Sequence, residues 1–123
     1  MIDHFMLKVR DAEESKAFYE KALGAIGFFI MAHFEERNAY GFGRTRNKPD
    51  FWVEPGGPLV PTIHLAFSCD DREQVDRFHA VALAAGATDN GAPGVRPYRE
   101  HYYGAFVLDP DGHNIEAVCR RVY

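Results

Sequence analysis

The chain has 123 residues, of which 46% are apolar and 26% charged, as expected for a folded soluble domain rather than a disordered one. Its formal net charge is −4 and no basic stripe dominates, which argues against a nucleic-acid partner. No apolar stretch approaches the roughly 20 residues of a membrane span and no export signal is visible. We therefore expect a cytoplasmic protein without a membrane partner, in which Cys69 and Cys119 are reduced core residues.

The sequence repeats itself at an offset of 60 residues, and the match needs no gap from His4 to Leu23. The matched pairs are His4/His64, Asp11/Asp71, Glu13/Glu73, Phe18/Phe78, Ala22/Ala82 and Leu23/Leu83. One repetition indicates a duplicated unit, and the Pro-Gly-Gly-Pro stretch at 55–58 is the natural joint. We expect a single domain over 1–123, made of one module over about 1–57 and another over about 60–123.

The first module is predicted to run β-α-β-β-β. Residues 2–9 alternate between an apolar face and a face that carries His4, which is typical of a strand packed on one side. Asp11 is the predicted N-cap of a helix that Gly24 or Gly27 ends. Three shorter strands are expected near 27–33, 38–44 and 50–54.

The second module repeats this order. Residues 62–69 alternate as a strand with His64 on the less apolar face, and Asp71 is the predicted N-cap of a helix that Gly86 ends. Strands are expected near 94–97, 102–108 and 113–119, with the last two joined by a type I turn at 109–112. The predicted fold class is α+β, with two βαβββ modules that form a curled mixed sheet around a central cavity.

The strand faces opposite the helices carry the side chains that are able to bind a metal. These are His4, His64, Glu116 and either Trp52 or Glu54. Two imidazoles and one carboxylate suit Fe(II) and related ions, and a second carboxylate suits Zn, Ni, Co or Mn. We therefore predict a divalent metal at His4, His64 and Glu116. Whether Glu54 is a fourth ligand is left open by the sequence. Alternatively, each histidine is a hydrogen-bonded structural residue and Glu116 pairs with a nearby Arg or Lys.

Four segments carry a resemblance to a known family: DHF at 3–5, SKAFYEKALG at 15–24, IHLAF at 63–67 and FVLDPDGHNIE at 106–116. On these segments the chain resembles the vicinal oxygen chelate superfamily. That superfamily includes glyoxalase I, extradiol dioxygenases, fosfomycin-resistance enzymes, methylmalonyl-CoA epimerase and bleomycin-resistance proteins. The resemblance implies paired βαβββ modules around a metal cavity, with the three ligands at His4, His64 and Glu116.

The fourth ligand of glyoxalase I-like members belongs on the strand at 50–54. Glu54 has the right facing but lies late in that strand, and Trp52 can hold the ligand's place instead. Three ligands resemble the dioxygenase pattern and four resemble that of glyoxalase I. The resemblance also implies a homodimer, in which His4 of one copy can face His64 of the other.

Further residues are expected around the cavity. Tyr103 and His101, on or next to the strand at 102–108, are the candidate catalytic groups, as an acid or hydrogen-bond donor. Trp52 is a candidate for stacking on a substrate, and Arg44 for holding an anionic group, a role also open to Arg96 and Arg99. Each of these arginines can equally be solvated surface.

Three functions follow from these observations. The first is a metal-dependent glyoxalase- or dioxygenase-like enzyme (a dioxygenase, lyase or isomerase) that chelates two neighbouring oxygens of a small substrate. The second is a metal-free binding protein of the bleomycin-resistance type, which sequesters a planar or cationic compound. The third is a structural or regulatory dimer whose pocket binds neither metal nor ligand. Fold alone does not choose among them.

Overall fold

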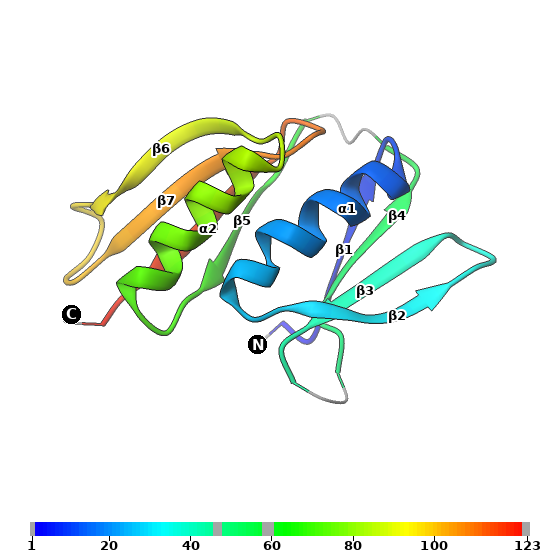
Figure 1. Ribbon diagram of the computed structural model, residues 1–123, viewed down its shortest axis with the longest axis horizontal. Coiled ribbons are helices and arrows are strands. Elements are labelled where there is room, and N and C mark those ends of the chain that lie inside the picture. The colour runs from blue at the N-terminus through cyan, green and yellow to red at the C-terminus, as the bar shows by residue number, and fades with distance from the viewer. Residues whose placement is uncertain (1, 46–47, 58–60, 122–123) are drawn as a thin grey trace.

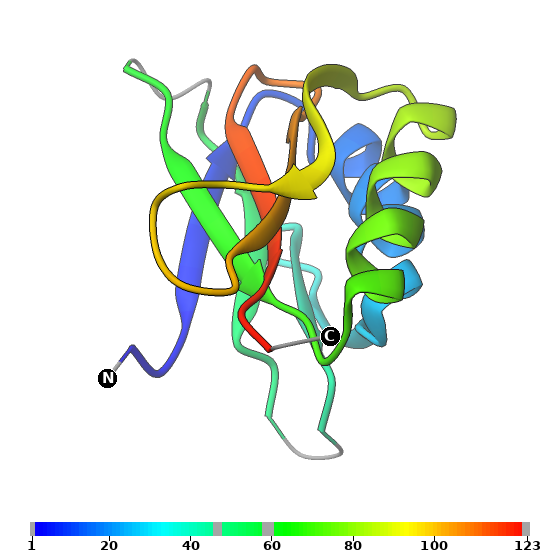
Figure 2. The ribbon, with the colours of Figure 1, turned by 90° about the vertical axis from the view of Figure 1, so that its left-hand side faces the viewer.

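The computed structural model describes residues 2–45, 48–57 and 61–121. It consists of two modules side by side, each a four-stranded sheet covered by one helix (Figure 1). Both helices lie on the same side of the molecule, and the strands form the other side (Figure 2). Neither helix in the described residues has the length and apolar character needed to cross a membrane.

The first module contains one helix and four strands. In chain order these are β1 (Phe5–Val9), α1 (Ala12–Ala22), the 3-10 turn η1 (Gly24–Ile26), β2 (Phe29–Phe34), β3 (Ala39–Gly43) and β4 (Phe51–Pro55). The sheet order is β1-β4-β3-β2, with β1 and β4 parallel. The Asp11 side chain accepts hydrogen bonds from the first-turn backbone N–H groups of α1, as predicted. Gly27, at φ 93°, ends η1 in the left-handed conformation that glycine tolerates.

The second module repeats the arrangement. Its elements are β5 (His64–Ser68), α2 (Arg72–Ala84), β6 (Thr88–Val95), β7 (Tyr103–Leu108) and β8 (Asn114–Cys119). The sheet order is β5-β8-β7-β6, with β5 and β8 parallel. Asp71 caps α2 by accepting from the Gln74 N–H. The predicted α+β class with two βαβββ modules is confirmed. Among the described residues, however, the strands form two separate sheets that do not close into a barrel.

One strand lies where the sequence pattern did not place it. The prediction of a strand near 94–97 is wrong in its bounds, because β6 spans Thr88–Val95. This stretch contains two glycines and a proline, which ordinarily mark a turn rather than a strand. The segment can form a strand because it lies at the edge of the sheet, where proline costs no hydrogen bond. Its pairing with β7 also skips residues on both sides of Gly91, which accommodates the irregular residues.

An aromatic cluster and a docked turn are among the contacts that join the modules. The Phe67 ring of β5 lies 5.4 Å from the Phe28 ring and 5.3 Å from the Phe51 ring, both nearly perpendicular to it. The turn at 109–112 docks on α1, where the buried Tyr19 hydroxyl donates to Asp109. Cys69 and Cys119 are buried core residues, as predicted, and burial raises the pKa of the Cys69 thiol to about 12.

Candidate active site

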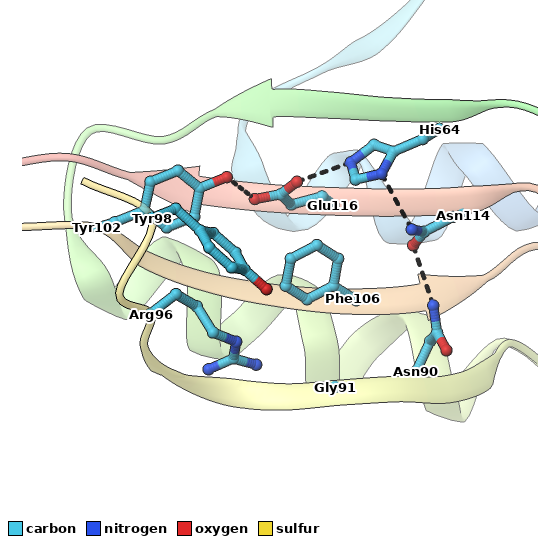
Figure 3. A pocket seen from close by; sticks show the side chains of 9 residues that line it. All are labelled: His64, Asn90, Gly91, Arg96, Tyr98, Tyr102, Phe106, Asn114 and Glu116. Carbon is cyan, nitrogen blue, oxygen red and sulfur yellow. Dashed lines mark hydrogen bonds and ion pairs between the residues drawn. The ribbon is translucent and has the colours of Figure 1, made fainter.

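A pocket of about 540 Å³ opens on the face of the second sheet that points away from α2 (Figure 3). Strands β5, β6, β7 and β8 and the loop after β6 supply its walls. The lining residues are His64, Asn90, Gly91, Arg96, Tyr98, Tyr102, Phe106, Asn114 and Glu116. The pocket therefore combines polar and charged groups with three aromatic rings, a composition suited to a small polar ligand.

His64 and Glu116 form the polar centre of this pocket. The parallel register pairs His64 with Asn114 and Ala66 with Glu116, so the alternation along both strands points His64 and Glu116 to the same face. His64 Nε2 lies 2.8 Å from Glu116 Oε1. The Glu116 side chain is 3% exposed and the His64 side chain is 49% exposed, so a buried carboxylate meets an imidazole that a ligand can reach.

Both side chains are held by further polar groups. The Tyr102 hydroxyl donates to Glu116 Oε2, and the Asn114 amide lies 3.0 Å from His64 Nδ1. Asn90 Nδ2 in turn donates to Asn114 Oδ1 at 3.2 Å. Burial and the hydrogen bond to Glu116 raise the pKa of Tyr102 to about 12, so its phenol stays protonated as the donor at neutral pH. The result is a continuous row of side chains from Asn90 to Tyr102 (Figure 3).

The spacing of the His64 and Glu116 donor atoms fits two neighbouring ligands of one metal ion. Two ligands that each lie about 2.1 Å from one ion and at right angles are about 3 Å apart, and the observed separation of the two donor atoms is 2.8 Å. Metal-binding histidines and carboxylates in proteins are held by outer hydrogen bonds, which Asn114 and Tyr102 supply here. Either end of the Asn114 amide can face the ring, so Oδ1 can accept the Nδ1 proton when Nε2 binds a metal.

The third predicted ligand lies elsewhere in the chain. His4 is exposed, contacts Asp3 at 2.9 Å, and lines a separate pocket of about 280 Å³ with Trp52. Within residues 2–45, 48–57 and 61–121, no three His, Cys, Asp or Glu side chains come close enough to hold a metal. One chain therefore brings His64 and Glu116 together but not His4.

The strand register distinguishes Trp52 from Glu54. Met6 pairs with Trp52 in the first module, and Ala66, which matches Met6 in the repeat, pairs with Glu116 in the second. Trp52 therefore occupies the position equivalent to Glu116, and its ring stacks on Phe34 at 5.2 Å. Glu54 lies two residues further along and binds Lys8 and Arg37.

Of the remaining predicted site residues, Tyr103, His101 and Arg44 lie outside the pocket that contains His64, whereas Arg96 lines it. The Tyr103 hydroxyl donates to Asp76 of α2 at 2.7 Å, on the opposite face of the sheet. His101 is exposed in the turn before β7, with φ 57°. Arg44 donates to the Ser68 carbonyl at 2.9 Å and lies over the Phe28 ring.

Tyr102 lines the pocket and binds Glu116, but the sequence pattern gave it no role. Two adjacent tyrosines precede Gly104 and Ala105, so the local pattern shows no contrast between the two faces of the strand. Counting back from Phe106, which pairs with Glu116, would have placed the residues at even positions, and hence Tyr102, on the pocket side.

Comparisons with known proteins agree with this architecture. The profile of the Glyoxalase/Bleomycin resistance protein/Dioxygenase superfamily matches residues 1–117. A glyoxalase/bleomycin resistance protein from Albidiferax ferrireducens T118 is 31% identical, with a TM-score of 0.77 over 97% of this chain and 98% of that chain. No curated protein sequence matches this chain.

Two more distant structures share the fold. A glyoxalase/bleomycin resistance protein/dioxygenase family enzyme from Burkholderia phytofirmans PsJN is 24% identical, with a TM-score of 0.73 over 98% of both chains. The fosfomycin resistance protein FosX from Mesorhizobium loti is 19% identical, with a TM-score of 0.71 over 99% of this chain and 93% of that one. The profile match spans nearly the whole chain, so the protein belongs to the glyoxalase/bleomycin resistance protein/dioxygenase superfamily.

Proposed function

We propose that the protein is a metal-dependent enzyme that acts on a small substrate with two neighbouring oxygens, and that His64 and Glu116 are two of the metal ligands. The observation that carries this proposal is the 2.8 Å separation of His64 Nε2 and Glu116 Oε1 inside a polar pocket. Membership in a superfamily whose members commonly use divalent metals supports it. The metal would be Fe, Mn, Zn, Ni or Co, since imidazole and carboxylate together suit these ions.

The third ligand in this proposal is His4 of a second copy. His4 is exposed on the open face of the first sheet, whereas the His64–Glu116 pair lies on the open face of the second. A two-fold dimer that sets the first module of one copy against the second module of the other forms two identical three-ligand sites. A homodimer would therefore be the active form.

The chain's own residues have defined tasks in such a site. When bound, the metal acts as a Lewis acid that polarises the two substrate oxygens and stabilises the negative charge that develops on them. Tyr102 fixes the Glu116 carboxylate and Asn114 fixes the plane of the His64 ring. The rings of Phe106 and Tyr98 cover the substrate and reduce its contact with water. The reaction class is that of a dioxygenase, lyase or isomerase.

The test combines metal analysis with a mixed dimer. Protein purified without chelator is expected to hold about one divalent ion per chain, and His64→Ala and Glu116→Ala should each lose it. His4→Ala should lose it as well. A dimer of one His4→Ala chain and one Glu116→Ala chain, isolated with two different tags, should regain one site of two, because the intact ligands then meet across the interface. A wild-type protein without stoichiometric metal overturns the proposal, and a mixed dimer without metal overturns the shared site.

A metal-free binding protein is the second candidate. The observation in its favour is that His64 and Glu116 satisfy each other with a hydrogen bond, which leaves neither dependent on a metal. This function requires tight binding of a planar or cationic compound in the presence of a chelator, unchanged by Glu116→Ala. The two candidates thus give opposite results with the same variant.

A further inference from the structure

Arg96 lies at the end of the pocket opposite the His64–Glu116 pair. The Phe106 ring lies between them: its centre is 5.9 Å from the centre of the His64 ring and 5.4 Å from Cζ of Arg96. Figure 3 shows the guanidinium and the imidazole on opposite sides of this ring. A ligand resting on Phe106 would therefore meet a cation at one end and the imidazole–carboxylate pair at the other.

Two glycines of β6 make room for the guanidinium. A Cβ atom at Gly91 would lie 3.2 Å from Arg96 Nη2, and a Cβ atom at Gly94 would lie 3.0 Å from Nη1. Arg96 Nη2 donates to the Ala92 carbonyl at 2.7 Å, which fixes the plane of the group. The irregular pairing of β6, together with its small residues, therefore builds a cradle that positions one cation.

The charge of Arg96 is not neutralised within the described chain. Arg10, Arg37 and Arg77 each pair with a carboxylate. Among residues 2–45, 48–57 and 61–121, no carboxylate pairs with Arg96, and its side chain makes one hydrogen bond from five N–H groups. A half-buried guanidinium with free donors in a pocket is prepared to bind an oxyanion through two parallel hydrogen bonds.

We infer that Arg96 is the anion-recognition residue of this pocket and that the ligand is a small organic acid. Its carboxylate or phosphonate binds the Arg96 guanidinium, and its body lies on Phe106. Oxygens at its other end point to His64 and Glu116, and this last part rests on the proposed function. The anion site itself depends only on Arg96, Gly91 and Gly94, so the two can fail separately.

The test is an NMR titration of the full-length protein in EDTA. The probes are mandelate, its neutral amide mandelamide, and phenylphosphonate, followed through the amide signals of the pocket residues. Wild type should bind an anion at least about tenfold more tightly than mandelamide, since charge-assisted hydrogen bonds are lost with the amide. Tighter binding of mandelate identifies a carboxylate as the recognised group, and tighter binding of phenylphosphonate identifies a phosphonate.

Variants locate the effect. Arg96→Gln should weaken binding of the preferred anion at least about tenfold and abolish the preference over the amide. Arg99→Gln removes the same charge from an exposed neighbour outside the pocket and should change affinity less than about twofold. Gly94→Ala keeps the guanidinium but displaces it, and should also weaken the anion. Thermal unfolding and the one-dimensional spectrum confirm that each variant is folded.

Several results would overturn the inference. These are equal affinity for acid and amide, an unchanged affinity in Arg96→Gln, and the absence of saturable anion binding to wild type. Repeating the titration with Zn²⁺ in place of EDTA separates this inference from the proposed function, since Zn²⁺ is diamagnetic and leaves the pocket signals visible. Additional tightening with Zn²⁺ that His64→Ala removes supports the metal site, whereas anion binding without such tightening supports Arg96 and counts against the metal site.

Discussion

The two modules share their backbone but differ in the chemistry of their open faces. Both have the same strand order and an aspartate cap on the helix. In the second module, the carboxylate of Glu116 meets an imidazole. In the first, the equivalent position holds Trp52, and Glu54, two residues further along the strand, binds two cations.

This difference shows which part of a duplicated fold is constrained. The strand order and the aspartate caps are the same in both modules, whereas the side chains on the open faces differ. The first module has a histidine in the matched position, His4, but an aromatic ring at the position of the acidic partner. It therefore offers one ligand where the second offers two. The following variants test this comparison.

Of these variants, the largest effect is expected at the support of His64. Asn114→Leu should weaken metal binding roughly 10- to 100-fold, because the imidazole loses the side-chain amide that orients it. Asn114→Asp offers a carboxylate at the same place and should retain most of the affinity. Competition with a chromogenic chelator measures both constants. Equal weakening by the two variants would contradict the role given to the amide.

A smaller gain is expected if the first module is made to resemble the second. Trp52→Glu places a carboxylate at the position equivalent to Glu116, which would add a fourth ligand beside His4 and tighten metal binding roughly tenfold. Trp52→Gln is the matched control, since it removes the stacking on Phe34 without adding charge. The same chelator competition applies. Identical affinities in the two variants would show that the register match does not extend to the side chains.

The smallest effect concerns Glu54. Glu54→Gln should leave metal affinity unchanged within about twofold and lower the free energy of unfolding by about 1 kcal/mol at neutral pH, since Lys8 and Arg37 are partly exposed. The hydrogen bond from Lys8, followed by the hydrogen bond and charge of Arg37, lowers the pKa of Glu54 from 4.5. This stabilisation is therefore complete above pH 4.5 and is lost as the pH falls through the lower value of the folded protein.

Urea unfolding of both proteins across this pH range measures the Glu54 effect. The two stabilities should converge in acid. A gap that is independent of pH would mean that Glu54 contributes through packing rather than through its charge, and a loss of metal would place it in the site after all.

The sequence predicted the backbone better than the site, for physical reasons. Alternation and the 60-residue repeat predicted the first and last strands of each module well, because one buried face imposes a strict period of two. The same facing argument placed His64 beside Glu116. It did not place β6, whose glycines and proline contradict strand propensity, because an edge strand tolerates them.

The long and flexible side chains were harder to predict. Arg44 and Arg96 are equivalent as residue types, but only the structure shows that one caps a carbonyl near Phe28 while the other lies in a glycine cradle. Likewise, Tyr102 and Tyr103 are neighbours with no local signal to assign their faces. These positions depend on tertiary contacts, which no short sequence window contains.

The turn at 109–112 gives the duplication a final consequence. The turn belongs to the second module by sequence. Its side chains nevertheless bind the first module: Asp109 accepts a hydrogen bond from the buried Tyr19 hydroxyl, and Asp111 accepts one from the backbone N–H of Arg10. The segment that leads directly into β8, and hence to Glu116, is therefore anchored on a helix of the opposite half. Either module on its own would lack these partners. In this chain they are supplied in cis, so the halves that look separable by sequence depend on each other for the contacts that hold this turn.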